Sequence, residues 1–522
     1  MADRKYLHAQ FLATDGNDNM TWVERLPDGR LFTILSHSKM TNYDGKNTAI
    51  PTSQFLFGRI SDDNGKTWGA PYFLYEWPEK LPRFVHAGFK FDRVGRLHVF
   101  ALEIHDCDIK SLRGNIAYVR FDSYRGENPY FNDIPALNRY TGSLNNAIET
   151  ESGRLVVPFS TFLNGRFVSN SIYSDDHGTT WSASANIAIA DDETDPETGA
   201  VEPVVVEVKP GVLVMLIRTV LSRLWYAISY DEGASWSKPQ PTTLISSNSP
   251  AVLLKLPSGR IFVAWNDVQG QPMSGVRYSS ARQCLHAAVS DDGLQHVHGI
   301  RTVLKKQVGD QDTVHNAYPT VAMYDDTSIL LRTLEVMGKD GSDWKVVQGF
   351  LGLLDPAFLD EREVCNNWDE WVCDHDKTET GIRLTPTKEN MAHAIVNFPY
   401  GQNGELTLRV SGDLPQGTKV LLSDCYIDRY TFLPSMRDSG YNDKIGKPYT
   451  EFAPTACGEW VLRWDDTAVT LLVDGNAVQT VEKAENGGFN HLTVMFDGDG
   501  ELSLDHFTVK VDKTDLKTDI TY

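Results

Sequence analysis

Cysteine is scarce in this chain of 522 residues, and its placement argues against the usual cysteine-based sites. No two cysteines form a C-x-x-C pair, so a zinc site built on such a pair is not expected. Four of the six follow residue 360, so a disulfide would be expected mainly in that part. Buried free thiols are the preferred prediction. The six are Cys107, Cys284, Cys365, Cys373, Cys425 and Cys457.

Long apolar runs and a surplus of basic residues are also missing. No apolar run approaches the roughly 20 residues that span a bilayer, and the N-terminal residues contain no apolar segment typical of a secretory signal. The location stays open between the cytoplasm and secretion after trimming. The net charge of −21 argues against nucleic acid and anionic membranes as partners. A small acidic substrate remains compatible, because a local arginine cluster can override the overall field. The oligomeric state stays open.

What the sequence does contain is a repeated hairpin pattern: a short apolar strand, a turn that ends in glycine, and a second apolar strand. A degraded sixth copy covers residues 320–331. Copies follow one another at about 45 to 65 residues, the size of a four-stranded propeller blade. We therefore predict an all-β fold that begins with a six-bladed β-propeller over residues 1–359. The five clear copies turn at Gly29, Gly95, Gly153, Gly211 and Gly259.

From about residue 360 the blade pattern gives way to short alternating strands. The turn Asp474-Gly475-Asn476 between alternating apolar segments predicts a tight hairpin. Segments between residues 458 and 496 resemble the back half of a concanavalin-like jelly roll, which predicts a β-sandwich over residues 360–522. Packing against the propeller as a structural support is its preferred role. Lectin-like binding is the alternative, through Trp368, Trp371, Trp460 or Trp464.

A second motif lies between the hairpins. The segment S-D-D-N-G-K-T-W at residues 61–68 has close counterparts at 174–181 and 229–236, which share its serine, second aspartate, glycine, hydroxyl residue and tryptophan. A shorter version, S-D-D-G, lies at 290–293. Its aspartate and hydroxyl side chains suit hydrogen bonds to turn amides, and its tryptophan suits packing between sheets. These segments resemble Asp boxes, the hallmark of the sialidase-like (BNR) propeller superfamily. We interpret them as structural turns rather than as calcium or sugar sites.

Polar and aromatic residues stand at or just ahead of each predicted innermost strand. Because these strands line one funnel in a propeller, their first residues converge on its axis, where a small polar ligand is expected. A turn at residues 209–211 also brings Glu202 and Arg218 to the same edge of one hairpin. The converging residues are Trp22, His86, Asn145, Asn146, Glu202, Asn248 and Tyr318.

The resemblance to sialidases implies roles for several of these residues. Members of that superfamily use a tyrosine nucleophile, a glutamate that activates it, three arginines on the substrate carboxylate, and an aspartate acid/base. At the matching positions Tyr318 would be the nucleophile and Glu202 its base. Arg218 and Arg282, the latter in an R-x-x-L context, would bind the anion. The implied activity is that of an exo-acting glycoside hydrolase that releases a terminal acidic or deoxy sugar from a glycan with retention, without a cofactor.

Two positions depart from the family pattern. Where the first arginine belongs, in an R-I-P motif about ten residues before the first turn glycine, this chain has Asn19-Met20-Thr21, and Arg25 is out of register. The sequence therefore does not name sialic acid as the sugar. For the acid/base, Asp44 lies at a suitable place in the first-blade loop, although Asp44-Gly45 is also an ordinary turn. His86 and Asp106 are the next candidates for proton transfer.

Other interpretations stay open at this point. Glu202 and Arg218 could form a structural ion pair, Arg282 could be a surface residue, and Tyr318 could pack the channel. A polysaccharide lyase or a rhamnosidase-type enzyme could use the same scaffold, and so could a non-catalytic glycan-binding protein. No group of residues has convincing metal-ligand spacing, so no metal is expected.

Overall fold

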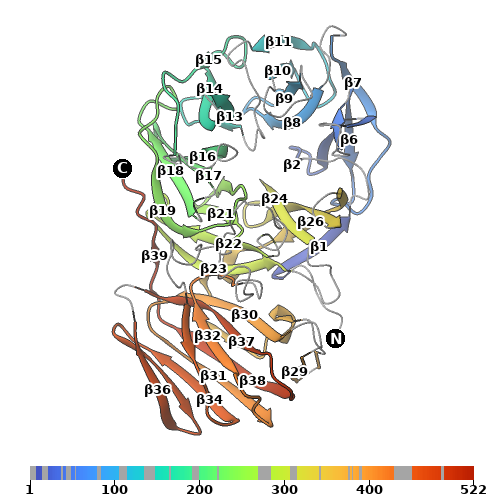
Figure 1. Cartoon of the computed structure of the whole chain (residues 1–522). Coiled ribbons are helices and arrows are strands. Elements are labelled where there is room, and N and C mark those ends of the chain that lie inside the picture. Colours follow the sequence, from blue (N-terminus) through green and yellow to red (C-terminus); the bar gives the residue numbers. More distant parts are fainter. Residues whose placement is uncertain are drawn as a thin grey trace.

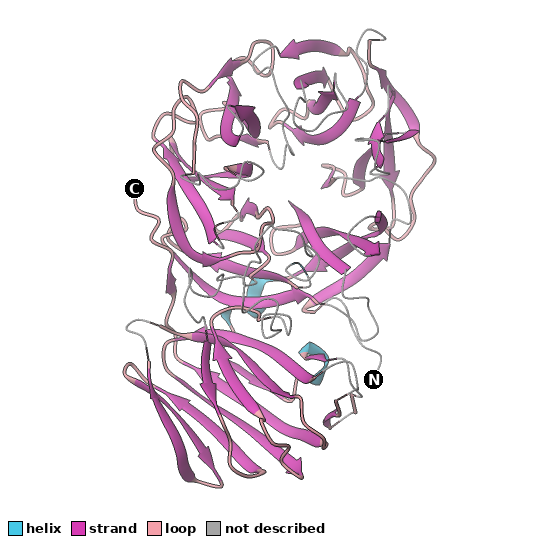
Figure 2. Cartoon of the chain, in the orientation of Figure 1, coloured by secondary structure: helices cyan, strands magenta, loops and turns pink. Residues whose placement is uncertain are grey.

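The computed structural model of the chain consists of strands and loops almost throughout, with short 3₁₀ helices such as η2 (Pro356–Asp360) and η3 (Trp368–Glu370) (Figure 2). The all-β prediction is confirmed. Within the residues it describes, no helix is long and apolar enough to cross a membrane. The structure describes residues 7–14, 22–36, 39–42, 49–52, 55–78, 84–104, 114–134, 147–163, 166–190, 199–219, 221, 223–267, 282, 284–305, 314–339, 343–373, 377–378, 380–386, 391–427, 449–483 and 487–522.

Antiparallel sheets of four or five strands are arranged in a ring in the upper part of Figure 1. The first contains β2 (Val23–Arg25), β3 (Leu31–Ser36), β6 (Phe55–Ser61) and β7 (Tyr72–Glu76). The second contains β8 (Phe84–Phe91), β9 (Leu97–Ile104), β10 (Gly114–Phe121) and β11 (Tyr130–Ile134). The third contains β12 (Ile148–Glu149), β13 (Leu155–Leu163), β14 (Arg166–Ser174) and β15 (Ser182–Ala183).

The ring continues with three further sheets. The strands β4 (Lys39–Asn42) and β5 (Ala49–Thr52) form a separate two-stranded sheet. The fourth sheet contains β16 (Val201–Lys209), β17 (Val212–Arg218), β18 (Arg223–Ser229) and β19 (Gln240–Ile245). The fifth contains β20 (Val252–Lys255), β21 (Ile261–Trp265), β22 (Leu285–Ser290), β23 (His296–Leu304) and β39 (Leu516–Lys517). The sixth contains β24 (Val314–Met323), β25 (Ile329–Lys339), β26 (Asp343–Leu354) and β1 (Ala9–Thr14).

Each sequence-predicted hairpin is the first pair of strands in one of these sheets. In the fourth sheet, β16 and β17 are joined at Pro210 and Gly211, and Gly211 takes a φ of 78°, a conformation that suits glycine. The pairing of Val201 with Arg218 brings the start of β16 beside the end of β17, as predicted. The sequence did not indicate that β1 would pair with β26, so that a strand from the N-terminal region completes the sixth sheet.

The Asp boxes are tight turns between the third and fourth strands of their sheets. In the first, Asp63 accepts hydrogen bonds from the Thr67 amide (2.8 Å) and hydroxyl (2.7 Å), and Ser61 accepts one from the Gly65 amide (2.8 Å). The segment at 290–293 is a complete turn of the same kind, because His296 bonds to Asp292 through its amide (2.9 Å) and ring (2.7 Å). These hydrogen bonds are internal to the turns, which supports their structural interpretation.

The C-terminal strands form two sheets that enclose one hydrophobic core (Figure 1). Trp368, Trp371, Trp460 and Trp464 are buried in that core. Lectin-like binding through these four rings is therefore wrong, because a glycan cannot reach them. One sheet contains β27 (Glu363–Cys365), β38 (Leu502–Val511), β31 (Gly404–Gly412), β34 (Gly458–Trp464), β35 (Ala468–Val473) and β36 (Asn476–Glu482), with β29 (Gly381–Leu384) beside β38. The other contains β28 (Val372–Cys373), β30 (Ala392–Gly401), β37 (Phe489–Phe496), β32 (Lys419–Ser423) and β33 (Tyr449–Phe452).

A buried ion pair joins the fifth sheet to the segment that leads into the C-terminal sheets. Arg301 of β23 donates to the Glu370 carboxylate of η3 (2.8 Å), and His8 lies 3.4 Å from the same carboxylate. Burial on its own raises the pKa of the Glu370 carboxyl, but attraction to Arg301 and His8 outweighs it and lowers that pKa to about 2. The ionised carboxylate therefore stabilises the folded state at neutral pH.

We predict that Glu370→Gln lowers the free energy of unfolding at pH 7 by about 3 kcal/mol, because it leaves the buried Arg301 guanidinium without its main counter-charge. The folded-state pKa is depressed, so this contribution is present above the unfolded-state pKa of 4.5 and is lost as the pH falls towards 2. Urea unfolding of wild type and variant at several pH values measures the difference. Glu361→Gln, which removes an exposed partner of Arg301, is the control and should cost little. A difference between wild type and Glu370→Gln that stays constant from pH 7 to pH 3 would contradict the assignment.

Candidate active site

Two innermost strands carry the same local distortion, and each places a chemically active side chain. Glu202 in β16 and Tyr318 in β24 have positive φ angles of 46° and 54°, which residues other than glycine seldom adopt. A proline follows each of them and has no N–H to offer the strand ladder. At both points the register shifts, so that two residues oppose one residue of the neighbouring strand. A bulge of this kind turns a side chain away from its regular direction.

The side chains of these two bulges meet at Arg218. The Arg218 guanidinium donates to the Glu202 carboxylate and, over 3.4 Å, to the Tyr318 hydroxyl oxygen. The Tyr318 hydroxyl donates to Glu202 Oε1, also over 3.4 Å. Both contacts of the Tyr318 hydroxyl are therefore at the long end of the hydrogen-bond range. Ser160 of the third sheet accepts a hydrogen bond from the Glu202 amide (2.6 Å), which holds the bulge in place.

Asn248 holds both arginines. Its side-chain oxygen accepts a hydrogen bond from Arg218 Nε (2.7 Å), and its backbone carbonyl accepts one from Arg282. The Arg282 guanidinium also lies over the Tyr318 ring, with its carbon 5.5 Å from the ring centroid. The structure thus brings together in one cluster five residues that the sequence predicts for the site. We call it the anion cluster, and its members are Glu202, Arg218, Asn248, Arg282 and Tyr318.

The anion cluster has more positive than negative charge. The single carboxylate of Glu202 is engaged by Arg218, whereas Arg282 meets a carbonyl and an aromatic ring. Burial lowers the pKa of the Arg282 guanidinium, and the nearby Arg218 charge lowers it further, against the opposing influence of Tyr318 and Glu202. The pKa of Arg218 is raised, because attraction to Glu202 and Tyr318 outweighs the effect of burial. A bound anion would supply the negative charge that balances Arg282.

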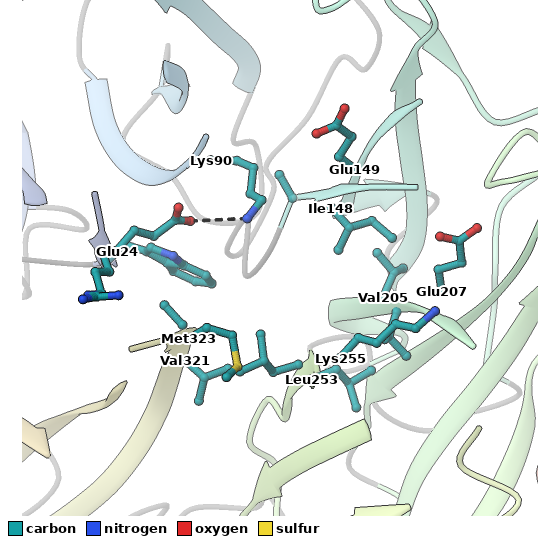
Figure 3. Close-up of a pocket in the computed structure, with 16 residues that line it drawn as sticks. Glu24, Lys90, Ile148, Glu149, Val205, Glu207, Leu253, Lys255, Val321 and Met323 are labelled. Atoms are coloured by element: carbon teal, nitrogen blue, oxygen red, sulfur yellow. Dashed lines mark ion pairs between the residues drawn. The ribbon is translucent and has the colours of Figure 1, made fainter. Parts of the chain in front are cut away.

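The first strands of the six ring sheets also enclose a cavity of about 400 Å³ (Figure 3). Ile148, Val205, Leu253, Val321 and Met323 form much of its wall, and an ion pair of 3.7 Å between Lys90 and Glu24 lies at one side. Trp22, predicted to bind substrate, is buried and lines this cavity. The residues of the anion cluster do not line it. The first cavity residues of β16 and β24, Val205 and Val321, come three positions after Glu202 and Tyr318. The cavity therefore begins about 10 Å along these strands from the two side chains of the cluster.

Five candidate residues from the sequence cannot be placed, or have a side chain that the structure does not describe. Asp44 and Asn146 lie outside the described residues, as do Asn145 and Asp106. The backbone of His86 lies in β8, where the register shifts between His86 and Gly88, but its side chain is outside the described part of the structure. Their assigned roles remain predictions. Among the described residues, no group of histidine, cysteine, aspartate or glutamate side chains is arranged to hold a metal ion.

Sequence reasoning did not find the residues that support the anion cluster. Ser160 lies inside an apolar strand and carries no recognisable motif. Asn248 was predicted to contact substrate, and its contacts with Arg218 and Arg282 add a supporting role. Asn266 also supports the cluster, through hydrogen bonds to Cys284, Asn316 and Ser249. The sequence carried one signal for it, because the apolar strand before it is followed at once by the polar pair Asn266-Asp267, and polar residues beside a buried strand are usually hydrogen-bonded.

Comparison with known proteins gives a match for part of the chain. Residues 134–331 match the family described as a BNR repeat-like domain, which confirms the resemblance that the Asp boxes indicate. A comparison with curated proteins found no match. A similar solved structure is a protein of unknown function from Dyadobacter fermentans, with 15% identity, a TM-score of 0.47, and coverage of 68% of this chain and 100% of that one. Trypanosoma rangeli sialidase is similar at 13% identity and a TM-score of 0.43, over 97% of this chain and 92% of that one. NanB sialidase from Streptococcus pneumoniae is similar at 16% identity and a TM-score of 0.45, over 68% of this chain and 71% of that one.

We predict that Arg282→Met stabilises the ligand-free protein by about 1 kcal/mol, because it replaces with an apolar side chain a buried cation that, among the described residues, bonds to a carbonyl and no carboxylate. Arg218→Met is the matched comparison. It should destabilise the protein by about 3 kcal/mol, since it removes the guanidinium that forms an ion pair with the buried Glu202 carboxylate. Urea unfolding without ligand measures both changes. Equal destabilisation by the two substitutions would show that the cluster has no excess of positive charge.

Proposed function

We propose that the chain is an exo-acting, sialidase-like glycoside hydrolase that releases a terminal acidic or deoxy sugar from a glycan with retention. On this proposal the ring of sheets is a six-bladed β-propeller formed by residues 1–359, and residues 360–522 form a supporting β-sandwich. The BNR match over residues 134–331 supports the propeller assignment. The observation that carries the functional proposal is the Tyr318 phenol, placed between one carboxylate and two guanidinium groups.

Tyr318 would act as the nucleophile. A phenol is neutral until a base removes its proton, so it can approach an anomeric carbon that bears a carboxylate without charge repulsion. Glu202 would take that proton, a role supported by the hydrogen bond that its Oε1 accepts from the phenol. Attack by the phenolate oxygen then forms a glycosyl–tyrosine intermediate as the bond to the leaving group breaks. Attack by water returns the original anomeric configuration.

Arg218 and Arg282 would hold the acidic group of the sugar. The two guanidinium groups share Asn248 as a support. Arg218 uses Nε and Nη1 for Asn248, Glu202 and Tyr318, so its Nη2 would donate to a carboxylate together with Arg282. The positive balance of the anion cluster supports an anionic ligand over a neutral one. Arg218 also bonds to Glu202 and Tyr318, so one residue would couple substrate binding to activation of the nucleophile.

The remaining roles follow from the sequence pattern. Asp44 would protonate the leaving group and later activate the water, while His86, Asn146 and Trp22 would contact the sugar. Without an arginine at Asn19, the anion would be held by two arginines instead of three. We expect this to weaken the preference for sialic acid and to allow other acidic sugars.

We predict that wild-type protein hydrolyses at least one member of a panel of fluorogenic glycosides of sialic acids and uronic acids. Tyr318→Phe should lower kcat/KM on the order of 10³-fold or more, because it removes the attacking oxygen. Steady-state fluorescence assays measure both. Tyr226→Phe is the control, since that hydroxyl bonds to the Asp519 carbonyl (2.9 Å) away from the anion cluster and should not affect turnover.

Three outcomes would count against the assignment. Equal activity of wild type and Tyr318→Phe would exclude the tyrosine nucleophile. An unsaturated product that absorbs ultraviolet light would identify a lyase instead of a hydrolase. Tight glycan binding without turnover, unchanged in Glu202→Gln, would identify a non-catalytic binding protein.

A further inference from the structure

Asn266 lies directly after β21 and is completely buried. Its side-chain nitrogen donates hydrogen bonds to the carbonyls of Cys284 (2.6 Å) and Asn316 (2.9 Å). Its side-chain oxygen accepts a hydrogen bond from the Ser249 hydroxyl (2.6 Å). One amide thus connects three separate segments of the fifth and sixth sheets.

Each of these segments carries a residue of the anion cluster. Ser249 follows Asn248 directly, Cys284 comes two residues after Arg282, and Asn316 comes two residues before Tyr318. The backbone carbonyl of Asn266 also accepts a hydrogen bond from the Ser247 amide (3.3 Å), so both neighbours of Asn248 are bonded to this one residue.

Two of these segments lie beyond the regular strand pairing. The pairing of β20 with β21 starts at Val252 and Ala264, and that of β21 with β22 ends at Trp265 and His286. In β24, Asn316 still pairs with Glu335 of β25, but the register shifts between Ala317 and Thr320, beside Tyr318. The side chain of Asn266 adds hydrogen bonds to the backbone at these points. An aspartate could not donate the two hydrogen bonds, and an apolar residue could make none of the three.

We infer that Asn266 is a positioning residue that holds the segments of Asn248, Arg282 and Tyr318 in one arrangement. Its effect on turnover rests on the proposed function, whereas its effect on geometry does not. A displacement of about 1 Å in a catalytic group can cost on the order of 100-fold in rate, so the loss of this amide should reach the chemistry without removing any group that touches substrate.

The test compares Asn266→Ala with Asn397→Ala. Asn397 is a buried asparagine of β30 with a matched set of bonds. Its nitrogen donates to the carbonyls of Ile300 (3.3 Å) and Asn490 (3.1 Å), and its oxygen accepts from the Thr302 amide (2.9 Å). Both variants should lower Tm to a similar extent. Only Asn266→Ala should lower kcat, by about 100-fold, with a smaller change in KM. Crystal structures should show the Arg282 and Tyr318 side chains displaced in Asn266→Ala and unchanged in Asn397→Ala.

A milder variant covers the case in which Asn266→Ala does not fold. Ser249→Ala removes one of the three side-chain bonds, and we expect it to lower Tm less than Asn266→Ala does and to lose about 10-fold in kcat. Unmoved Arg282 and Tyr318 side chains in the variant structures, or equal loss of kcat in Asn266→Ala and Asn397→Ala, would overturn the inference. If wild type hydrolyses no glycoside, the proposed function fails, and the crystal structures still decide whether Asn266 positions the cluster.

Discussion

The candidate site depends on one backbone constraint, which is the interruption of two innermost strands by a proline. Glu202 and Tyr318, which come directly before Pro203 and Pro319, leave the regular strand conformation and adopt positive φ at bulges, the places in a sheet where a proline that cannot donate to the ladder is tolerated. A regular strand would alternate its side chains between two fixed faces. The two bulges release Glu202 and Tyr318 from that alternation and bring the carboxylate and the phenol to the same guanidinium. Such strained conformations persist where the surrounding structure holds them.

The charges of the cluster and the hydrogen bonds around it explain why the strained backbone at Glu202 and Tyr318 is retained. Arg282 is buried and Arg218 is largely buried beside it, and the cluster sets the one carboxylate of Glu202 against these two cations. Such an arrangement is costly unless a ligand supplies negative charge. The neighbouring residues support these side chains at fixed points: Ser160 holds the Glu202 amide, and Asn248 holds both guanidinium groups. On the proposed function, this locally unfavourable arrangement is retained because it would bind an acidic ligand, as functional sites often keep such strain.

Local patterns predicted more of the fold than of the site. Turn glycines such as Gly211 and the apolar strands on each side identified the hairpins. The turn at Gly211 then predicted that Glu202 lies beside Arg218, as the pairing of Val201 with Arg218 confirms. The pairing of β1 with β26 joins segments more than 300 residues apart and leaves no local pattern, so it was not predicted. The tryptophans of the C-terminal sheets were ambiguous, because a tryptophan that binds sugar and one that packs a core look alike in sequence. The positive φ angles at Glu202 and Tyr318 and the bonds of Asn266 depend on the tertiary contacts of several sheets.

The central claim is that Tyr318 forms the covalent bond to the sugar. Wild-type protein incubated with a fluorinated, slowly hydrolysed analogue of its acidic substrate, then digested with trypsin, allows mass spectrometry to locate the label. The account predicts one adduct, in the peptide between Lys306 and Arg332, with tandem fragmentation placing the sugar on Tyr318 and not on Tyr324. A sugar on Glu202 or on another carboxylate, or turnover of the analogue with no covalent adduct on Tyr318, would contradict it.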